Sequence, residues 1–189
     1  LEMIINNLSS YGFINYKIIT HYKSELIEEF LKKNNLFNLN IELFREENPM
    51  GTIGGLHKLK KKISSDFIVT NGDIVTDTNF SEFVNFHKNK KSIATFCIKE
   101  IENKIDFGVI TLSKDKIEDI LEKPNQKYFR NAGIHCFKKR ILNYLNGGKE
   151  DIISLFGKLK NNKEKVSAFP IHENWNDIGT IDSLSKIKK

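Results

Sequence analysis

Cysteine and proline are scarce in this chain of 189 residues, which contains two cysteines and three prolines. Both cysteines, Cys97 and Cys136, lie inside apolar runs typical of strands, where a free cysteine usually packs as a small apolar side chain. Two cysteines without metal-ligand spacing argue against a disulfide framework and against a cysteine-based metal site. We therefore expect a reducing, cytoplasmic compartment.

Long apolar runs are absent as well. None approaches the roughly 18–20 residues needed to cross a bilayer, and the first residues show no signal-peptide pattern. We expect a soluble protein without membrane contact. Hydrophobic residues still make up 39% of the chain, with 14 Phe, which is enough for a core. The length favours a single domain over residues 1–189, with two small domains as the alternative.

Catalytic triads and histidine metal motifs are also missing, because the five histidines show no HxxxH or HExxH spacing and no Ser-His-Asp or Cys-His set can be assembled. Arginine is rare, occurring only at Arg45, Arg130 and Arg140. Base-edge readout of DNA favours arginine, so specific DNA recognition is not expected. The net charge of +6 indicates solvated lysine-rich faces or an anionic partner such as a nucleotide or phosphate.

Hydrophobic periodicity alternates between strand and helix through about residue 100, which favours a mainly parallel sheet with helices on both faces. A hairpin turn at 113–115 predicts an antiparallel addition. Asn79 is the expected N-cap of one helix, because Glu82 follows three residues later. Helices are expected near residues 2–8, 23–33, 56–62, 80–88, 139–145, 151–160 and 181–187, and strands near 16–20, 39–44, 66–70, 93–99, 107–112, 116–122, 131–137 and 166–169.

Six short clusters of glycine and polar residues, each at the end of an apolar run, are the most informative feature that is present. Each alone is typical of a turn. Their order predicts one site read from several loops, because strand ends at the carboxyl edge of an α/β sheet converge on the crevice that binds ligands. The clusters occupy residues 51–55 (GTIGG), 71–73 (NGD), 106–109 (DFGV), 122–124 (EKP), 131–133 (NAG) and 175–180 (WNDIGT).

Asp73 and Asp177 are the candidate metal ligands. Asp73 follows a buried strand and Gly72, where a carboxylate suits an octahedral Mg²⁺ held by one or two carboxylates together with substrate phosphates. Asp177 lies between Trp175, the only tryptophan, and Gly179. The alternative for each aspartate is a turn or a helix cap. A shared metal ion requires that these two distant loops meet in the fold.

The remaining clusters allow ligand-binding and purely structural interpretations. The glycines of 51–55 let backbone N–H groups approach a flat or anionic ligand at a helix N-terminus, although their spacing is neither GxGxxG nor GxxxxGK. Glu122 and Lys123 pair an acceptor for hydroxyl groups with a point charge for phosphate, or form a surface ion pair. Asn131 either hydrogen-bonds a polyol or starts a strand.

Taken together, these residues resemble the sugar-phosphate nucleotidyltransferases, also called nucleotide-sugar pyrophosphorylases. The resemblance extends to about Ser185 and is carried by PMGTIGGL at 49–56, NGD at 71–73, DFGVI at 106–110, EKP at 122–124, NAGIHCF at 131–137 and WNDIGT at 175–180. Residues 98–100 and 169–173 look most like the bacterial branch in which this domain follows a pair of CBS modules. The resemblance implies a three-layer α/β/α fold with a mixed, mainly parallel sheet, of the nucleotide-diphospho-sugar transferase (GT-A-like) type.

The resemblance also implies an activity. A nucleotidyl group would pass from a nucleoside triphosphate to a sugar 1-phosphate with release of pyrophosphate, in surface-glycan precursor synthesis. GTP is slightly favoured, no nucleic acid or membrane is expected as a partner, and a homo-oligomer stays open. The implied catalytic residues are Asp73 and Asp177, which would bind Mg²⁺, and Lys123, which would bind the sugar phosphate. The implied nucleotide contacts are Glu46, Gly51, Thr52, Gly54 and Gly72, and the implied sugar contacts are Gly108, Glu122 and Asn131.

One departure concerns the beginning of the chain. Family members open with a strand and a glycine-rich G-x-G-T-R-L loop that cradles the triphosphate, whereas this sequence begins at the helix that follows them. We therefore expect a fold lacking the first strand and its loop, and little or no transferase activity from this chain. Removal of a single preorganised donor already costs ~10²–10³ in rate.

Three other functions remain as alternatives. A catalytically silent homologue would still bind a sugar nucleotide. A glycosyltransferase shares nucleotide-sugar ligands and the broad fold, but typically uses a D-x-D metal motif that Asp73-Ile74-Val75 does not supply. A basic nucleic-acid-binding module needs aromatic residues interleaved with lysines on one face, and the aromatic residues here lie within strands and helix stripes instead.

Overall fold

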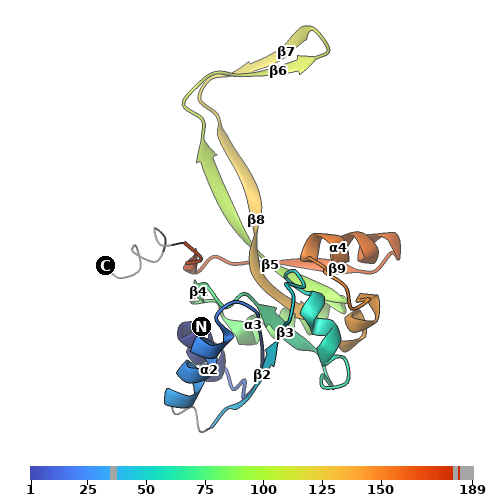
Figure 1. Ribbon diagram of the computed structural model, residues 1–189. Coiled ribbons are helices and arrows are strands. Elements are labelled where there is room, and N and C mark those ends of the chain that lie inside the picture. Colours follow the sequence, from blue (N-terminus) through green and yellow to red (C-terminus); the bar gives the residue numbers. More distant parts are fainter. Residues whose placement is uncertain (35–37, 181–182, 184–189) are drawn as a thin grey trace.

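A computed structural model describes residues 1–34, 38–180 and 183 of the chain. Figure 1 shows helices and strands gathered in a body, from which a long two-stranded ribbon projects. The helices are α1 (Glu2–Ser10), α2 (Ser24–Lys33), α3 (Phe80–Lys90) and α4 (Ile152–Asn161), with two 3₁₀ helices, η1 (Gly54–Leu59) and η2 (Lys139–Tyr144). The strands are β1 (Asn15–Thr20), β2 (Asn40–Arg45), β3 (Phe67–Thr70), β4 (Ile74–Thr76), β5 (Ala94–Lys104), β6 (Val109–Ser113), β7 (Lys116–Leu121), β8 (Asn125–Phe137), β9 (Val166–Pro170) and β10 (Trp175–Asp177).

The central sheet has the strand order β3-β8-β5-β9. Strand β8 is antiparallel to β3 and to β5, and β5 is parallel to β9, so three of the four strands run in the same direction. Strands β1 and β2 form a separate parallel pair. This arrangement confirms the predicted α/β class with its mixed sheet.

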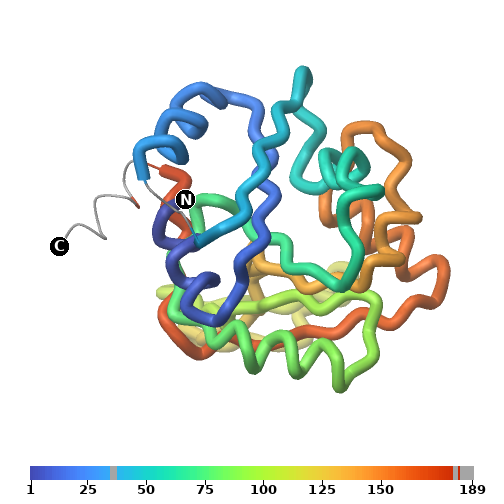
Figure 2. The backbone as a smooth tube through the Cα atoms, turned by 90° about the horizontal axis from the view of Figure 1, so that it is seen from below, coloured from blue at the N-terminus to red at the C-terminus, as the bar shows by residue number. Residues whose placement is uncertain are grey.

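Apolar side chains form two cores, one on each face of the central sheet. Successive side chains of β8 point to opposite faces of the sheet. Ile134 and Cys136 therefore join one core, and Phe137 joins the other. The first core includes residues of α1 and α3, and the second packs η1, η2 and α4 together. Figure 2 shows α3 as a green coil passing under the strands of the body. The central sheet with helices packed on each of its two faces gives the three layers, helix, sheet and helix.

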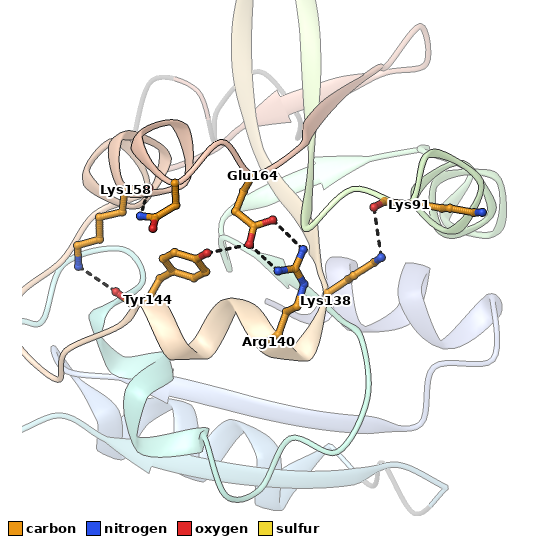
Figure 3. A network of polar contacts seen from close by, with 7 residues as sticks. Lys91, Lys138, Arg140, Tyr144, Lys158 and Glu164 are labelled. Atoms are coloured by element: carbon orange, nitrogen blue, oxygen red, sulfur yellow. Dashed lines mark hydrogen bonds and ion pairs between the residues drawn. The ribbon is translucent and has the colours of Figure 1, made fainter.

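A network of polar contacts links η2 to the segment that follows α4 (Figure 3). Arg140 and Tyr144 of η2 both donate to the Glu164 carboxylate, with Tyr144 Oη 2.7 Å from Glu164 Oε1. Lys158 of α4 donates to the Tyr144 carbonyl oxygen at 2.9 Å. These contacts fix the position of the chain between η2 and α4, which includes residues 148–151.

Strands β5 and β8 are much longer than the sequence predicts. They continue beyond the body to Lys104 and back from Asn125 as a ladder of paired residues, and the β6–β7 hairpin forms the tip. Residues 125–130 show no alternation of apolar side chains that would predict a strand. Lys127 on β8 forms ion pairs with Glu100 and Glu102 on β5, and these pairs stabilise an exposed ladder. We refer to residues 98–131 as the arm.

A large cavity separates the β1–β2 pair from the central sheet, and no strand pairing joins β1 to β3 among the described residues. The cavity has a volume of about 1080 Å³ and is lined by residues 15–20 of β1 on one side and residues 67–70 of β3 on the other. The residue that follows β1 (His21) and the two that follow β3 (Asn71 and Gly72) also line the cavity. The β1–β2 pair therefore contacts the rest of the body through loops and helices rather than through a shared ladder.

The short elements differ most from expectation. The segments expected as helices near 56–62 and 139–145 are 3₁₀ helices, and β4 and β10, of three residues each, were not predicted. The Asn79 cap is confirmed, because its side chain accepts from Glu82 N. Of the helix expected at 181–187, all but residue 183 lies outside the described residues. Across residues 1–34, 38–180 and 183, no helix combines the length and apolar character needed to span a bilayer.

Candidate active site

Asp73 and Asp177 meet because the short strands β4 and β10 pair antiparallel. Their register sets Asp177 opposite Ile74, the residue after Asp73, and Ile178 N donates to Asp73 O at 2.9 Å. A Cβ placed on Gly179 would stand 2.8 Å from Asp73 Oδ2 and 3.1 Å from Asp177 Oδ1. Both carboxylates thus border the same small space, and the structure brings together the two aspartates that the sequence picks out.

This pair suits a hard cation that takes the rest of its ligands from elsewhere. Asp177 is exposed and Asp73 is half-buried, so a ligand can reach both. Over the ranges that the structure describes, no group of three or more His, Cys, Asp or Glu side chains converges, which does not fit a protein-only zinc site. Two carboxylates with open positions fit Mg²⁺, which usually keeps waters or substrate phosphates as ligands.

Residues of β8 lie beside this pair. Asn71 N donates to Gly133 O at 3.0 Å, and Trp175 Nε1 on β10 donates to Ala132 O at 2.9 Å. Gly133 has φ +69, and a Cβ there would stand 2.9 Å from Asn71 Nδ2, so glycine is required for both backbone conformation and space. The cluster 131–133 is therefore next to the aspartates, as the sequence predicts.

Gly133 N and His135 Nε2 together hold the oxygen of the Asn131 amide. Asn131 Oδ1 lies 3.1 Å from Gly133 N and 3.1 Å from His135 Nε2. Because a backbone N–H can only donate, the Asn131 atom facing it is the oxygen, and His135 Nε2 must then carry a proton. Burial lowers the pKa of His135 to about 4, so the ring is neutral at pH 7. Asn131 Nδ2 is left to donate outward.

Protonation of His135 on Nε2 lowers the stability of the fold, because it leaves a buried acceptor without a donor in the described part of the chain. With the proton on Nε2, the Nδ1 atom carries a lone pair, and it is buried without a hydrogen-bond partner among the described residues. The ring is held by an edge-on contact with Phe96 and by stacking on Phe137, with centroid distances of 4.7 and 5.7 Å. A buried polar atom without a partner typically costs about 1–3 kcal/mol. The sequence shows no motif spacing among the histidines, so sequence reasoning missed this contact.

The glycine loop 51–55 is packed against residues 148–150. Ile53 N and Gly54 N both donate to Glu150 O at 3.2 Å. A Cβ on Gly51 would stand 2.4 Å from Glu150 O, and a Cβ on Gly54 would stand 2.6 Å from Gly148 O. The two glycines therefore permit a close approach of backbone to backbone. The Gly54 amide, which the sequence assigns to a ligand, already has a partner within the chain.

Glu46 holds the other side of this loop. The side chain is buried, with 7% of its surface exposed. Its Oε2 accepts from Met50 N at 3.2 Å, and its Oε1 would stand 2.3 Å from a Cβ on Gly55. Thr52 Oγ1 accepts from Ile152 N at the start of α4. Glu46 and Thr52 thus fix the loop in place, whatever else they bind.

Four of the five residues assigned to the nucleotide line the cavity between β1 and β3. These are Glu46, Gly51, Thr52 and Gly72, whereas Gly54 is not among the lining residues. The volume of about 1080 Å³ is slightly above the roughly 300–1,000 Å³ typical of ligand pockets. The nucleotide side of the predicted site is therefore gathered around one large cavity.

The residues assigned to the sugar and its phosphate are separated. Gly108 and Glu122 lie together near the tip of the arm, with 3.3 Å between a Cβ placed on Gly108 and Glu122 Oε2, and Lys123 follows. Asn131 lies at the base of the arm. The ladder between residues 125 and 131 is about 20 Å long at 3.3 Å per residue. Within one chain, the expected single crevice therefore holds Asn131 and the aspartates but not Gly108, Glu122 or Lys123.

Comparison with known proteins places this geometry in a family. The family model for nucleotidyl transferases matches residues 1–189, the whole of the chain. The chain belongs to the nucleotidyl transferase family. It is 30% identical over 193 residues to the bifunctional protein GlmU of Methanococcus vannielii, covering 95% of this chain and 44% of that protein. It is 24% identical to the mannose-1-phosphate guanylyltransferase of Mycobacterium tuberculosis, covering 97% of this chain and 53% of that protein.

Solved structures share the fold of this chain. HddC from Yersinia pseudotuberculosis matches with a TM-score of 0.74 at 23% identity, over 96% of this chain and 80% of that chain. The same protein has been solved in complex with GMP-PN, and this structure matches with a TM-score of 0.73. The chain spans about half the length of the curated relatives it matches.

Proposed function

We propose that this chain forms the nucleotidyltransferase unit of an enzyme that transfers a nucleotidyl group from a nucleoside triphosphate to a sugar 1-phosphate, with release of pyrophosphate. The observation that carries the proposal is the meeting of Asp73 and Asp177 beside Gly179 in a member of the nucleotidyl transferase family. The relative named as a mannose-1-phosphate guanylyltransferase supports a sugar phosphate as acceptor. Synthesis of surface-glycan precursors is the proposed context.

The proposed reaction needs no protein nucleophile. An oxygen of the sugar phosphate attacks the α-phosphorus of the triphosphate, the bond from that phosphorus to the bridging oxygen breaks, and pyrophosphate leaves with the bonding electrons. Asp73 and Asp177 would hold Mg²⁺, which supplies charge neutralisation at the phosphates when bound. The protein contributes mainly by positioning the two substrates in line.

Individual residues divide the positioning between them. The loop 51–55 and Gly72 border the cavity that would take the nucleotide. Asn131 Nδ2, oriented by the contacts of Oδ1 with Gly133 N and His135 Nε2, would donate to a sugar hydroxyl. Lys123 would offset the charge of the sugar phosphate. GTP is the proposed nucleotide, supported by the relative named as a guanylyltransferase and by the neighbour solved with GMP-PN. The free, buried Cys97 and Cys136 support a cytoplasmic location.

A sugar-nucleotide-binding homologue without transfer activity is the second candidate. The separation of Lys123 from the aspartate pair favours it, because the phosphate of an acceptor bound near Asp73 would lack its lysine within the same chain. Such a protein would bind nucleotide sugars but not the triphosphate. The two candidates therefore differ in GTP binding and share the product-binding site.

Calorimetry and pyrophosphate release together test the proposal. We expect the chain to bind a GDP-sugar and GTP in the presence of Mg²⁺, and both affinities to fall at least tenfold in Asp73→Asn and Asp177→Asn. Glu28→Gln is the matched control, because it also removes a carboxylate but lies exposed on α2. Binding of GDP-sugar without binding of GTP would select the silent homologue. Equal affinities in the aspartate and control variants would overturn both.

A further inference from the structure

A buried ion pair joins Glu150 to Lys158 of α4. The Glu150 side chain is 6% exposed and that of Lys158 is 33% exposed. Lys158 lies six residues after the first residue of α4, and its side chain runs back toward the start of the helix, as long helical side chains do. Its ammonium group also donates to Tyr144 O at 2.9 Å (Figure 3). One lysine therefore holds both the end of η2 and the residue before the cap of α4.

The backbone of Glu150 makes three hydrogen bonds to the glycine loop 51–55 and to Met50, the residue before it. Glu150 N donates to Met50 O at 2.8 Å. Glu150 O accepts from both Ile53 N and Gly54 N at 3.2 Å. The shape of the loop therefore depends on where the backbone of residue 150 is held.

The glycine loop has one side toward the cavity and another toward Glu150. Gly51 and Thr52 line the cavity between β1 and β3, and neither Glu150 nor Lys158 is among its lining residues. A ligand in the cavity would touch the loop without touching the ion pair. Any influence of the pair on such a ligand must therefore pass through the backbone of residue 150.

We propose that Lys158 and Glu150 are positioning residues for nucleotide binding. Lys158 neutralises the buried Glu150 carboxylate, and the backbone of Glu150 then holds the glycine loop in the shape that the nucleotide meets. The inference deepens the proposed function and rests on it for the identity of the ligand. The hydrogen bonds between the loop and Glu150 do not depend on that identity.

The charge of Glu150 makes the loop sensitive to Lys158. A buried carboxylate that loses its partner is strongly destabilising, and it regains solvation only by turning outward or by taking up a proton. An outward turn displaces the backbone of residue 150 and with it the three hydrogen bonds to the loop. Replacement of both charged groups leaves no buried ion. Loss of the lysine alone should therefore disturb the loop more than loss of both charges.

Hydrogen exchange of the Ile53 and Gly54 amides tests the positioning without a ligand, because exchange reports local opening. We expect at least tenfold faster exchange of both amides in Lys158→Met, and less than about a threefold change in Lys158→Arg, which keeps the charge and the donors. Lys160→Met is the matched control, since Lys160 is exposed on the same helix, and it should leave both rates unchanged. Unchanged rates in a folded Lys158→Met would overturn the proposal.

The double variant Glu150→Gln, Lys158→Met separates the effect of charge from that of packing. It lacks the same lysine contacts as the single variant, including the one to Tyr144 O, but it contains no buried carboxylate at position 150. We expect the exchange of the two amides to return to within about threefold of the wild type. Exchange as fast as in Lys158→Met would overturn the role of the charge. If Lys158→Met does not fold, a folded double variant with slow exchange supports the proposal, and a double variant that also fails to fold overturns it.

Calorimetry extends the test to the nucleotide. We expect the affinity for GDP-mannose to fall at least fivefold in Lys158→Met and to recover in the double variant. The affinity for Mg²⁺ without nucleotide should stay unchanged, because Asp73 and Asp177 are held by the pairing of β4 with β10. Equal losses of both affinities would indicate general damage to the fold and would overturn the positioning role.

The two measurements also separate this inference from the proposed function. A wild type that binds neither GDP-mannose nor GTP removes the proposed function, and the exchange rates then still decide whether the ion pair holds the loop. A wild type that binds GDP-mannose, with the same affinity and the same exchange rates in Lys158→Met, overturns the inference and leaves the proposed function intact.

Discussion

Asp73 and Asp177 are separated by more than a hundred residues in sequence, yet both border the space that the absent side chain of Gly179 leaves open. The contact depends on a ladder of three residues between β4 and β10. The aspartates themselves are held at the ends of these strands, and Gly179 N donates to Asp177 Oδ1 at 3.0 Å. Glycine at 179 is thus part of the site although it has no side chain.

Gly179→Ala should weaken metal binding more than it weakens the fold. The new methyl group would meet the far ends of two flexible carboxylates, which can move aside at small cost. We expect Mg²⁺ affinity, measured by calorimetry, to fall about tenfold, with a loss of less than about 1 kcal/mol in the free energy of unfolding. Unchanged Mg²⁺ affinity would contradict the placement of the ion between these oxygens.

Gly54→Ala should destabilise the protein, because its Cβ would stand 2.6 Å from Gly148 O and 3.1 Å from Glu150 N, which are backbone atoms. We expect a loss of about 1–3 kcal/mol in denaturant unfolding, as for other overpacked sites. Gly157→Ala in α4 is the matched control, since no atom lies within 4 Å of its Cβ. There the substitution should stabilise by about 0.5–1 kcal/mol. The same sign at both positions would refute the packing argument.

His135→Phe should separate stability from sugar binding. Phenylalanine keeps the contacts with Phe96 and Phe137 and removes the buried Nδ1 that lacks a partner, so thermal stability should be unchanged or higher. Asn131 Oδ1 then keeps Gly133 N as its remaining donor and is held less firmly, and we expect GDP-sugar affinity to fall several-fold while GTP affinity is retained. Partial rescue by His135→Gln, which again offers an N–H, distinguishes orientation of Asn131 from a packing effect.

Stability should fall as the pH drops from about 6.5 to 4. Burial lowers the pKa of His135 from 6.5 to about 4, so in this window the unfolded chain takes up a proton that the folded chain does not. The contribution is complete above pH 6.5 and is lost progressively below it, by about 3 kcal/mol at pH 4. Burial also lowers the pKa of His87, which adds to the same trend. Unfolding of His135→Phe across this range should show a shallower slope, and an identical slope would refute the assignment.

Much of the fold could be predicted because its long elements carry clear periodic patterns. The helices α2 and α3 and the strands β3 and β9 of the central sheet lie close to their expected ranges. The strands β4 and β10 have only three residues each, too few for alternation to be recognised. The aspartates that these strands position were nevertheless predicted as site residues. A carboxylate near glycine at the end of an apolar run indicates a ligand site even when the short strand beside it is not recognised.

The part of the site that could not be predicted depends on contacts between distant segments. Nothing in residues 148–150 indicates that Glu150 O receives the amides of Ile53 and Gly54. The contact between His135 and Asn131 requires the left-handed backbone at Gly133, since four residues along an ideal strand would separate them by about 13 Å. The length of the arm was missed for another reason: residues 125–130 are exposed on both faces and show no alternation of apolar and polar side chains, since Tyr128 and Phe129 are adjacent.

The seven residue pairs that join β5 to β8 within the arm, from Ile98 opposite Asn131 to Lys104 opposite Asn125, set its length. Removal of one residue from each strand would bring the tip closer to the body by about 3.3 Å and would turn every tip side chain to the opposite face. Removal of two from each would shorten it by about 7 Å and restore the original facing. The reach of Lys123 and the direction it faces are therefore coupled, and changes in arm length that preserve its orientation come in even steps.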